Sequence, residues 1–126
     1  MTIKAYVVDD QRAIVELLML LFAEIGVEAS GTTNSKHARE AIAATQPDLV
    51  LLDIMMPDPD GLSLLALLKD DPRTRDIPAV LCTASVVTPS QSGLFADRSI
   101  GVLSKPFTIT QLEELVAAVQ ERKNSH

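Results

Sequence analysis

The sequence predicts an α/β fold in which a parallel β-sheet is covered by helices on both faces. Short apolar runs alternate five times with segments that have a helical pattern or helix-start residues. One apolar run is continuous, as in a central parallel strand that is buried on both faces. A chain of 126 residues is long enough for one domain with a substantial core and too short for two of ordinary size. We therefore expect residues 1–126 to form a single domain.

The first strand and the first helix lie at the start of the chain. Residues 5–8 are a short apolar run. Residues 11–25 form a predicted helix, because their polar side chains are four or eight positions apart and share one narrow stripe. Gly26 ends this helix. The polar stripe consists of Arg12, Glu16 and Glu24.

The second strand and the second helix follow. Residues 27–29 form a short strand, and the charge of Glu28 places it at an edge of the sheet. A helix then begins at Asn34 or Ser35, either of which can cap it, and runs to about Ala44.

The third strand is the continuous apolar run over residues 49–52, and it ends at Asp53. A segment rich in Pro, Asp and Gly over residues 56–61 is typical of a turn. Residues 62–70 form the third predicted helix, which Pro72 stops.

Two strands and one helix complete the pattern. Residues 79–82 form the fourth strand, which ends at Thr83, and residues 100–103 form the fifth, which ends close to Lys105. The last helix covers residues 109–123. Its capping box is formed by Thr108 with Gln111 or by Thr110 with Glu113.

The stretch between Ala84 and Gly101 has the least regular pattern. A Thr, a Pro and a Gln over residues 88–91 are typical of a helix start. Gly93 weakens the interior of such a helix by about 1 kcal/mol relative to Ala. We expect a short, late-starting helix there.

The composition argues against nucleic-acid and membrane binding. Lys and Arg number 11 and Asp and Glu number 17, for a net charge of −6, whereas affinity for phosphate backbones comes mostly from Lys and Arg. The longest apolar stretch, residues 17–23, is too short to span a bilayer, and no secretory signal opens the chain.

The single cysteine, Cys82, lies in an apolar run and is expected to be a buried, unreactive thiol. We expect a cytoplasmic protein.

Polar side chains follow four of the five predicted strands. These residues are Asp9 and Asp10, Asp53, Thr83, and Lys105. The carboxyl ends of parallel strands meet at one edge of a sheet, so we expect the five side chains to converge. Two carboxylates about 5 Å apart repel each other by roughly 3 kcal/mol at an effective dielectric of 20, so three of them need a cation. Carboxylate oxygens are the ligands that Mg²⁺ prefers, and no His lies near these strand ends to favour Zn²⁺.

This set of groups suits phosphoryl transfer. A carboxylate beside Mg²⁺, an ammonium and a hydroxyl can attack phosphorus and form an acyl phosphate. The metal and Lys105 would neutralise the charge on the transferring oxygens. Asp53 is the predicted nucleophile because it ends the most buried strand, and Asp9 and Asp10 are predicted to hold the metal.

Four motifs in this order resemble the receiver domain of two-component response regulators. They are Val7-Val8-Asp9-Asp10, the run from Leu51-Leu52-Asp53 to Gly61, Thr83-Ala84, and Ser104-Lys105-Pro106-Phe107. The resemblance covers nearly the whole chain. It implies a flavodoxin-like, doubly wound sheet of five parallel strands in the order 2-1-3-4-5.

The resemblance also implies a function. Asp53 would accept a phosphoryl group from the phosphohistidine of a sensor histidine kinase or a histidine phosphotransfer protein, in a reaction that depends on Mg²⁺. The chain would be a signalling switch that changes conformation, with intrinsic autophosphorylation and autodephosphorylation, and not a metabolic enzyme.

Individual roles follow from the same resemblance. Asp10 would bind Mg²⁺ directly and Asp9 mostly through water, while Asp53 and the backbone carbonyl of Met55 would complete the protein ligands. The phosphoryl oxygens would be bound by Thr83 and Lys105.

The sequence departs from the family at one position. Relatives commonly carry Tyr or Phe three residues before the lysine, where the ring moves together with the threonine. Here that position is Val102. Because a valine has no ring to reorient, we expect an altered readout or signalling through another surface.

The first helix is apolar on more than one side, and two interpretations stay open. Its extra apolar residues are buried against the last helix, which is the interpretation we favour, or Leu20 belongs to a docking patch for a partner's helix.

Two other functions fit part of the pattern. Phosphohydrolases that use an aspartyl phosphate carry a second acid two residues after the nucleophile, but Met55 stands there in this chain. A receiver-like domain that only binds partners would not need the acids together with Thr83 and Lys105. The prolines and Gly61 around Asp58 and Asp60 favour turn roles for those two acids over a second metal site.

Overall fold

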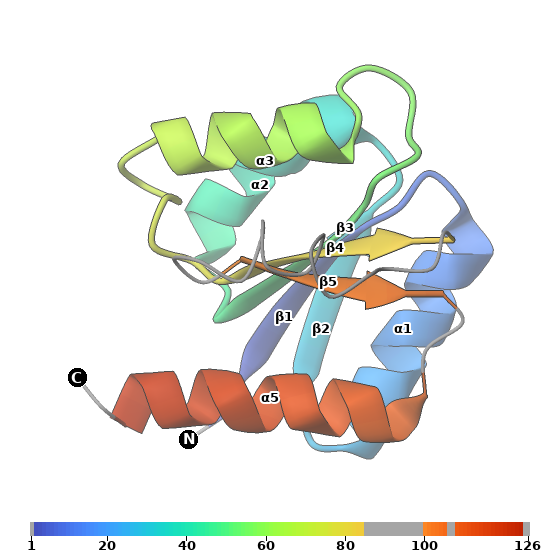
Figure 1. The fold of residues 1–126 in the computed structure, drawn as a ribbon, viewed down its shortest axis with the longest axis vertical. Helices are drawn as coiled ribbons and strands as arrows, with labels where there is room; N and C mark the ends of the chain where they lie inside the picture. Colours follow the sequence, from blue (N-terminus) through green and yellow to red (C-terminus); the bar gives the residue numbers. More distant parts are fainter. Residues whose placement is uncertain (1, 85–99, 106–107, 125–126) are drawn as a thin grey trace.

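The computed structural model describes residues 2–84, 100–105 and 108–124. Its sheet has five parallel strands in the order β2-β1-β3-β4-β5 (Figure 1), as expected. The strands are β1 (Lys4–Val8), β2 (Glu28–Thr32), β3 (Leu49–Asp53), β4 (Ala79–Thr83) and β5 (Ile100–Ser104). The helices described are α1 (Arg12–Glu24), α2 (Ser35–Thr45), α3 (Gly61–Asp70) and α5 (Ile109–Asn124). The helix expected near Thr88 lies outside the described residues.

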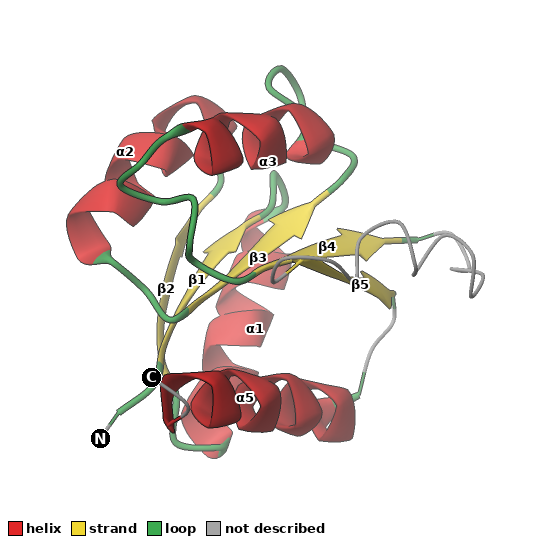
Figure 2. Ribbon diagram, turned by 60° about the vertical axis from the view of Figure 1, so that its left-hand side comes forward, coloured by secondary structure: helices red, strands yellow, loops and turns green. Residues whose placement is uncertain are grey.

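Helices cover both faces of the sheet. Figures 1 and 2 show α2 and α3 on one face, and α1 and α5 on the other. Because successive side chains of a strand point to opposite faces, Val7 joins the core under α1 and α5, whereas Val8 joins the core under α2 and α3. All five residues of β3 are buried, so this strand anchors both cores. Within the described chain, no helix combines the length and apolar character needed to cross a membrane.

The second strand differs most from the prediction. It was expected over residues 27–29 and extends over Glu28–Thr32. Its Ala, Ser and Gly residues have little preference for strands, so the pairing with β1, from Lys4 with Glu28 to Val8 with Thr32, sets its length. Its predicted place at an edge of the sheet is confirmed.

Side-chain caps begin three of the helices. Asn34 Oδ1 accepts a hydrogen bond of 3.0 Å from the N–H of Lys36 at α2. Asp60 Oδ1 accepts one of 2.8 Å from the N–H of Ser63 at α3, which is a local role as expected. At α5 the capping box is formed by Thr108 and Gln111, with bonds of 3.2 and 2.7 Å.

The apolar helix α1 is only partly buried. Phe22 is fully buried, and Met19 and Leu21 pack against the core under α1 and α5. Leu17 and Leu20 are 50% and 66% exposed. Burial against α5 therefore does not account for these two leucines.

The close approach of β2 to its neighbours generates a prediction about Gly31. A Cβ at this position would lie 2.5 Å from the carbonyl oxygen of Val7 and 2.9 Å from Cγ1 of Val15. We expect Gly31→Ala to lower the free energy of unfolding by about 1–3 kcal/mol, because the backbone or α1 must shift. Urea denaturation measures this change.

Gly101 provides a matched control in β5. The nearest atom to a Cβ there would be Cγ2 of Val80 at 3.5 Å, which is ordinary contact. Gly101→Ala should leave the unfolding midpoint nearly unchanged. Equal effects of the two substitutions would contradict this account of β2.

Candidate functional site

The carboxyl ends of the parallel strands bring the predicted site residues to one edge of the sheet. Asp9 follows β1 directly, Asp53 is the last residue of β3, and Thr83 is the last residue of β4. Lys105 follows β5. Asp9, Asp53 and Thr83 are buried, with 2%, 7% and 8% of their surfaces exposed. Asp10 is exposed beside them.

Three carboxylates form a cluster at this edge. Asp9, Asp10 and Asp53 each offer an oxygen, and these oxygens all lie within 4.8 Å of one another. The donors are hard oxygen atoms, two of them from buried carboxylates. Mg²⁺ prefers such ligands, so the residues present fit this ion.

Lys105 links the cluster across the sheet. Its Nζ lies 3.0 Å from Oδ2 of Asp9 and 3.3 Å from Oδ1 of Asp53. Its backbone N–H donates a hydrogen bond of 2.6 Å to the carbonyl oxygen of Thr83. The bond to Thr83 fixes the base of the lysine beside β4, and the ammonium reaches the ends of β1 and β3.

The charges of the cluster perturb its ionisable groups. Burial, and next the negative charge of Asp9, raise the pKa of Asp53, and Lys105 only partly opposes this rise. Burial disfavours the charged ammonium of Lys105, but the hydrogen bond to Asp9 and the two carboxylate charges outweigh it and raise its pKa. The single positive charge of Lys105 therefore does not balance the negative charge of the carboxylate cluster.

Both oxygens of Asp9 are engaged, which fixes its carboxylate. Oδ2 accepts from Lys105, and Oδ1 accepts a hydrogen bond of 2.9 Å from the N–H of Gln11 at the start of α1. The orientation of Asp9 is thus tied to the helix that follows it.

The loop after Asp53 is held by hydrogen bonds of its backbone groups to both backbone and side-chain partners. The N–H of Met55 donates to Oδ1 of Asp53 at 3.4 Å, and the Met55 side chain is 75% exposed. The N–H of Gly61 donates to the carbonyl oxygen of Ile54 at 3.1 Å. The hydroxyl of Ser35, at the start of α2, donates to the carbonyl oxygen of Pro57 at 3.2 Å.

The sequence predicts only a turn role for Gly61, whereas the structure places it against the site. A Cβ at this position would collide with the backbone of Asp53 and Ile54. Glycine therefore lets α3 begin directly against the strand end that carries the candidate nucleophile. The available signal was a glycine immediately after the helix-capping Asp60, a position that reads equally well as part of a turn.

Cys82 and Val102 lie on opposite faces of the sheet. Cys82 belongs to the core under α1 and α5, and burial raises the pKa of its thiol to about 12, as expected for an unreactive cysteine. Val102 pairs with Leu81 in the sheet and packs, partly buried, against the core under α2 and α3.

Comparisons with known proteins agree with this geometry. The profile of the response regulator receiver domain family matches residues 5–118. The chain is 43% identical over 84 residues to the response regulator PleD of Caulobacter vibrioides, which covers 67% of this chain and 18% of PleD. It is 32% identical over 106 residues to the polar-differentiation response regulator DivK of Brucella anthropi, which covers 80% of this chain and 85% of DivK.

The fold has a close structural counterpart. The receiver domain of the Francisella response regulator 1452 superposes with a TM-score of 0.83 at 26% identity, covering 97% of this chain and 99% of that one. The chain spans about half the length, 48% and 51%, of two further regulators that it matches. The family profile, the sheet order and the acidic edge together lead to one conclusion: this chain belongs to the response regulator receiver domain family of two-component signalling.

Proposed function

We propose that Asp53 is the phosphoacceptor of this receiver domain. Receiver domains take a phosphoryl group from a histidine kinase or a histidine phosphotransfer protein. The observation that carries the proposal is the position of Asp53 at the end of the buried central strand, beside two further acids and 3.3 Å from the ammonium of Lys105.

The transfer follows from the chemistry of these groups. A carboxylate oxygen of Asp53 attacks phosphorus, and the phosphorus–nitrogen bond of the donor phosphohistidine breaks. The imidazole leaves with the electron pair of that bond. Lys105 then exchanges its contact with the Asp53 carboxylate for one with a phosphoryl oxygen, and the hydroxyl of Thr83 bonds another.

Mg²⁺ would be held by Asp10 directly, by Asp9 through water, and by Asp53 and the backbone carbonyl of Met55. When bound, it supplies positive charge against the phosphoryl oxygens. The same residues support autophosphorylation from small phosphodonors and hydrolysis of the product, which places the chain among signalling switches.

Phosphorylation changes the charge at the end of β3. It replaces a carboxylate of charge −1 by a group of charge near −2. Thr83 and Lys105 respond to the added charge, and the equilibrium between two conformations shifts. Val102 packs under α2 and α3 and has no ring to follow Thr83. We therefore propose that Val102 itself does not reorient and that the signal leaves through another surface.

A labelling experiment tests the phosphoacceptor. Borohydride reduces an aspartyl phosphate to homoserine, so it records where the acyl phosphate formed. After incubation with acetyl phosphate and Mg²⁺, peptide mass spectrometry should find homoserine at position 53, and EDTA should abolish it. Asp53→Asn should give no homoserine. The matched control is Asp58→Asn, an exposed acid of the same loop, which should react like wild type.

Two results would contradict the assignment. One is label at another acid of the wild type, and the other is label retained by Asp53→Asn. Steady release of phosphate from an added phosphomonoester would favour the phosphohydrolase interpretation.

NMR tests the proposed readout. On phosphorylation the amide of Met55, two residues from Asp53, should shift strongly, whereas the methyl signals of Val102 should shift little. Val102→Tyr supplies the missing ring, and its ring signals should respond to phosphorylation. Methyl shifts of Val102 as large as the amide shift of Met55 would overturn the proposal.

A further inference from the structure

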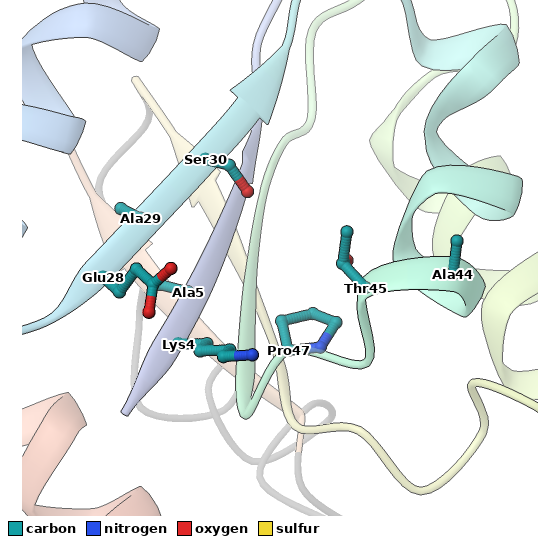
Figure 3. A pocket seen from close by; sticks show the side chains of 8 residues that line it. All are labelled: Lys4, Ala5, Glu28, Ala29, Ser30, Ala44, Thr45 and Pro47. Carbon is teal, nitrogen blue, oxygen red and sulfur yellow. The ribbon is translucent and has the colours of Figure 1, made fainter. Parts of the chain in front are cut away.

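Two hollows flank the outer edge of β2, one on each face of the sheet. On the α1 face lies a groove of about 540 Å³, whose lining includes the apolar side chains of Met19, Leu20, Ala23 and Val27. On the α2 face lies a hollow of about 320 Å³ with a mixed lining. Figure 3 shows this second hollow, with Glu28 and Ser30 on β2 and with Thr45 and Pro47 across from them.

The backbone of β2 is open between these hollows. In the described sheet β2 pairs only with β1. The N–H of Glu28 donates to Ile3 at 3.0 Å, and the carbonyl oxygen of Thr32 accepts from Asp9 at 3.3 Å. By the alternation of a parallel ladder, the N–H and C=O groups of Ala29 and Gly31 face away from β1.

An extended chain laid along this edge would meet both hollows. Its backbone would pair with Ala29 and Gly31, and its side chains would alternate between the apolar groove and the mixed hollow. The exposed Leu20, 66% of whose surface is accessible, would be covered in the groove. A helix could fill the groove but would leave the backbone groups and the second hollow unused.

The charges around the edge of β2 favour basic residues in the chain that binds there. Glu28 lines both hollows and Glu16 lines the groove, whereas Lys4, the single cation among these lining residues, lines the mixed hollow. The carboxyl ends of α1 and α2 lie beside the two hollows, and neither helix has a basic residue in its last turn. The partial negative charges of these helix ends add to the acids. A second copy of this chain, with its net charge of −6, fits poorly.

We propose that the β2 edge binds an extended segment of a partner protein in which apolar residues alternate with Lys or Arg. The segment matches β2 in length, about five residues or roughly 17 Å. The inference uses no residue of the Asp53 site, so it can be tested independently of the proposed function.

Three blocked peptides of about seven residues test the proposal. The first alternates Val and Lys, the second has the same composition with Val at helical spacing, and the third replaces Lys by Glu. Binding is followed by amide NMR and by hydrogen exchange. The first peptide should bind and slow the exchange of the Ala29 and Gly31 amides, and the other two should bind at least about tenfold more weakly.

Two variants and a control complete the test. Leu20→Ser should weaken binding of the first peptide about tenfold, while Leu67→Ser, at a 40% exposed leucine of α3, should not change it. Ala29→Pro removes an outward-facing N–H and no hydrogen bond to β1, so it should abolish binding while the pairing with β1 persists. The proposal is overturned by absence of binding, by equal binding of the helical isomer, or by unchanged exchange at Ala29 and Gly31.

Discussion

Three carboxylates approach one another at the carboxyl edge of the sheet, and the rest of the site depends on how that repulsion is offset. At their separation, within 4.8 Å, each pair repels by about 3 kcal/mol at an effective dielectric of 20. Lys105 contacts Asp9 and Asp53, but burial and the charge of Asp9 still raise the pKa of Asp53. The folded chain thus holds an excess of negative charge at this edge of the sheet, and a divalent cation can balance it. Once the charge is balanced, the edge can accept a negatively charged phosphoryl group.

The fold keeps these charges in place through its buried centre. All of β3 is buried between two helical layers, so Asp53 cannot retreat from Asp9 without disturbing both cores. Gly61 lets α3 start against the backbone of Asp53, and Ser35 ties the following loop to α2. Because small residues allow close approach at these points, the stable cores hold the site in a fixed geometry.

Much of this arrangement can be predicted from the sequence, because strand ends and helix caps are local signals. The convergence of Asp9, Asp53 and Lys105 follows from parallel strands alone, whereas the strand order came from the resemblance to receiver domains. The full length of β2 depends on pairing with β1, which the weak preferences of its residues do not reveal. The tight contacts of Gly31 and Gly61 arise only when segments that are distant in the sequence, or that fold back on each other, come together in space, so no local pattern marks them.

The stability of Asp53→Asn, measured with and without Mg²⁺, tests the charge imbalance most directly. At pH 7 in EDTA the variant should be more stable than wild type by roughly 1 kcal/mol, because it loses an ionised carboxylate that burial and Asp9 disfavour. Since the folded pKa of Asp53 lies above its ordinary value of 3.8, this advantage should fade as the pH falls through the interval between them. Mg²⁺ should reduce or reverse it. A variant less stable than wild type in EDTA, or a difference that Mg²⁺ leaves unchanged, would contradict the account.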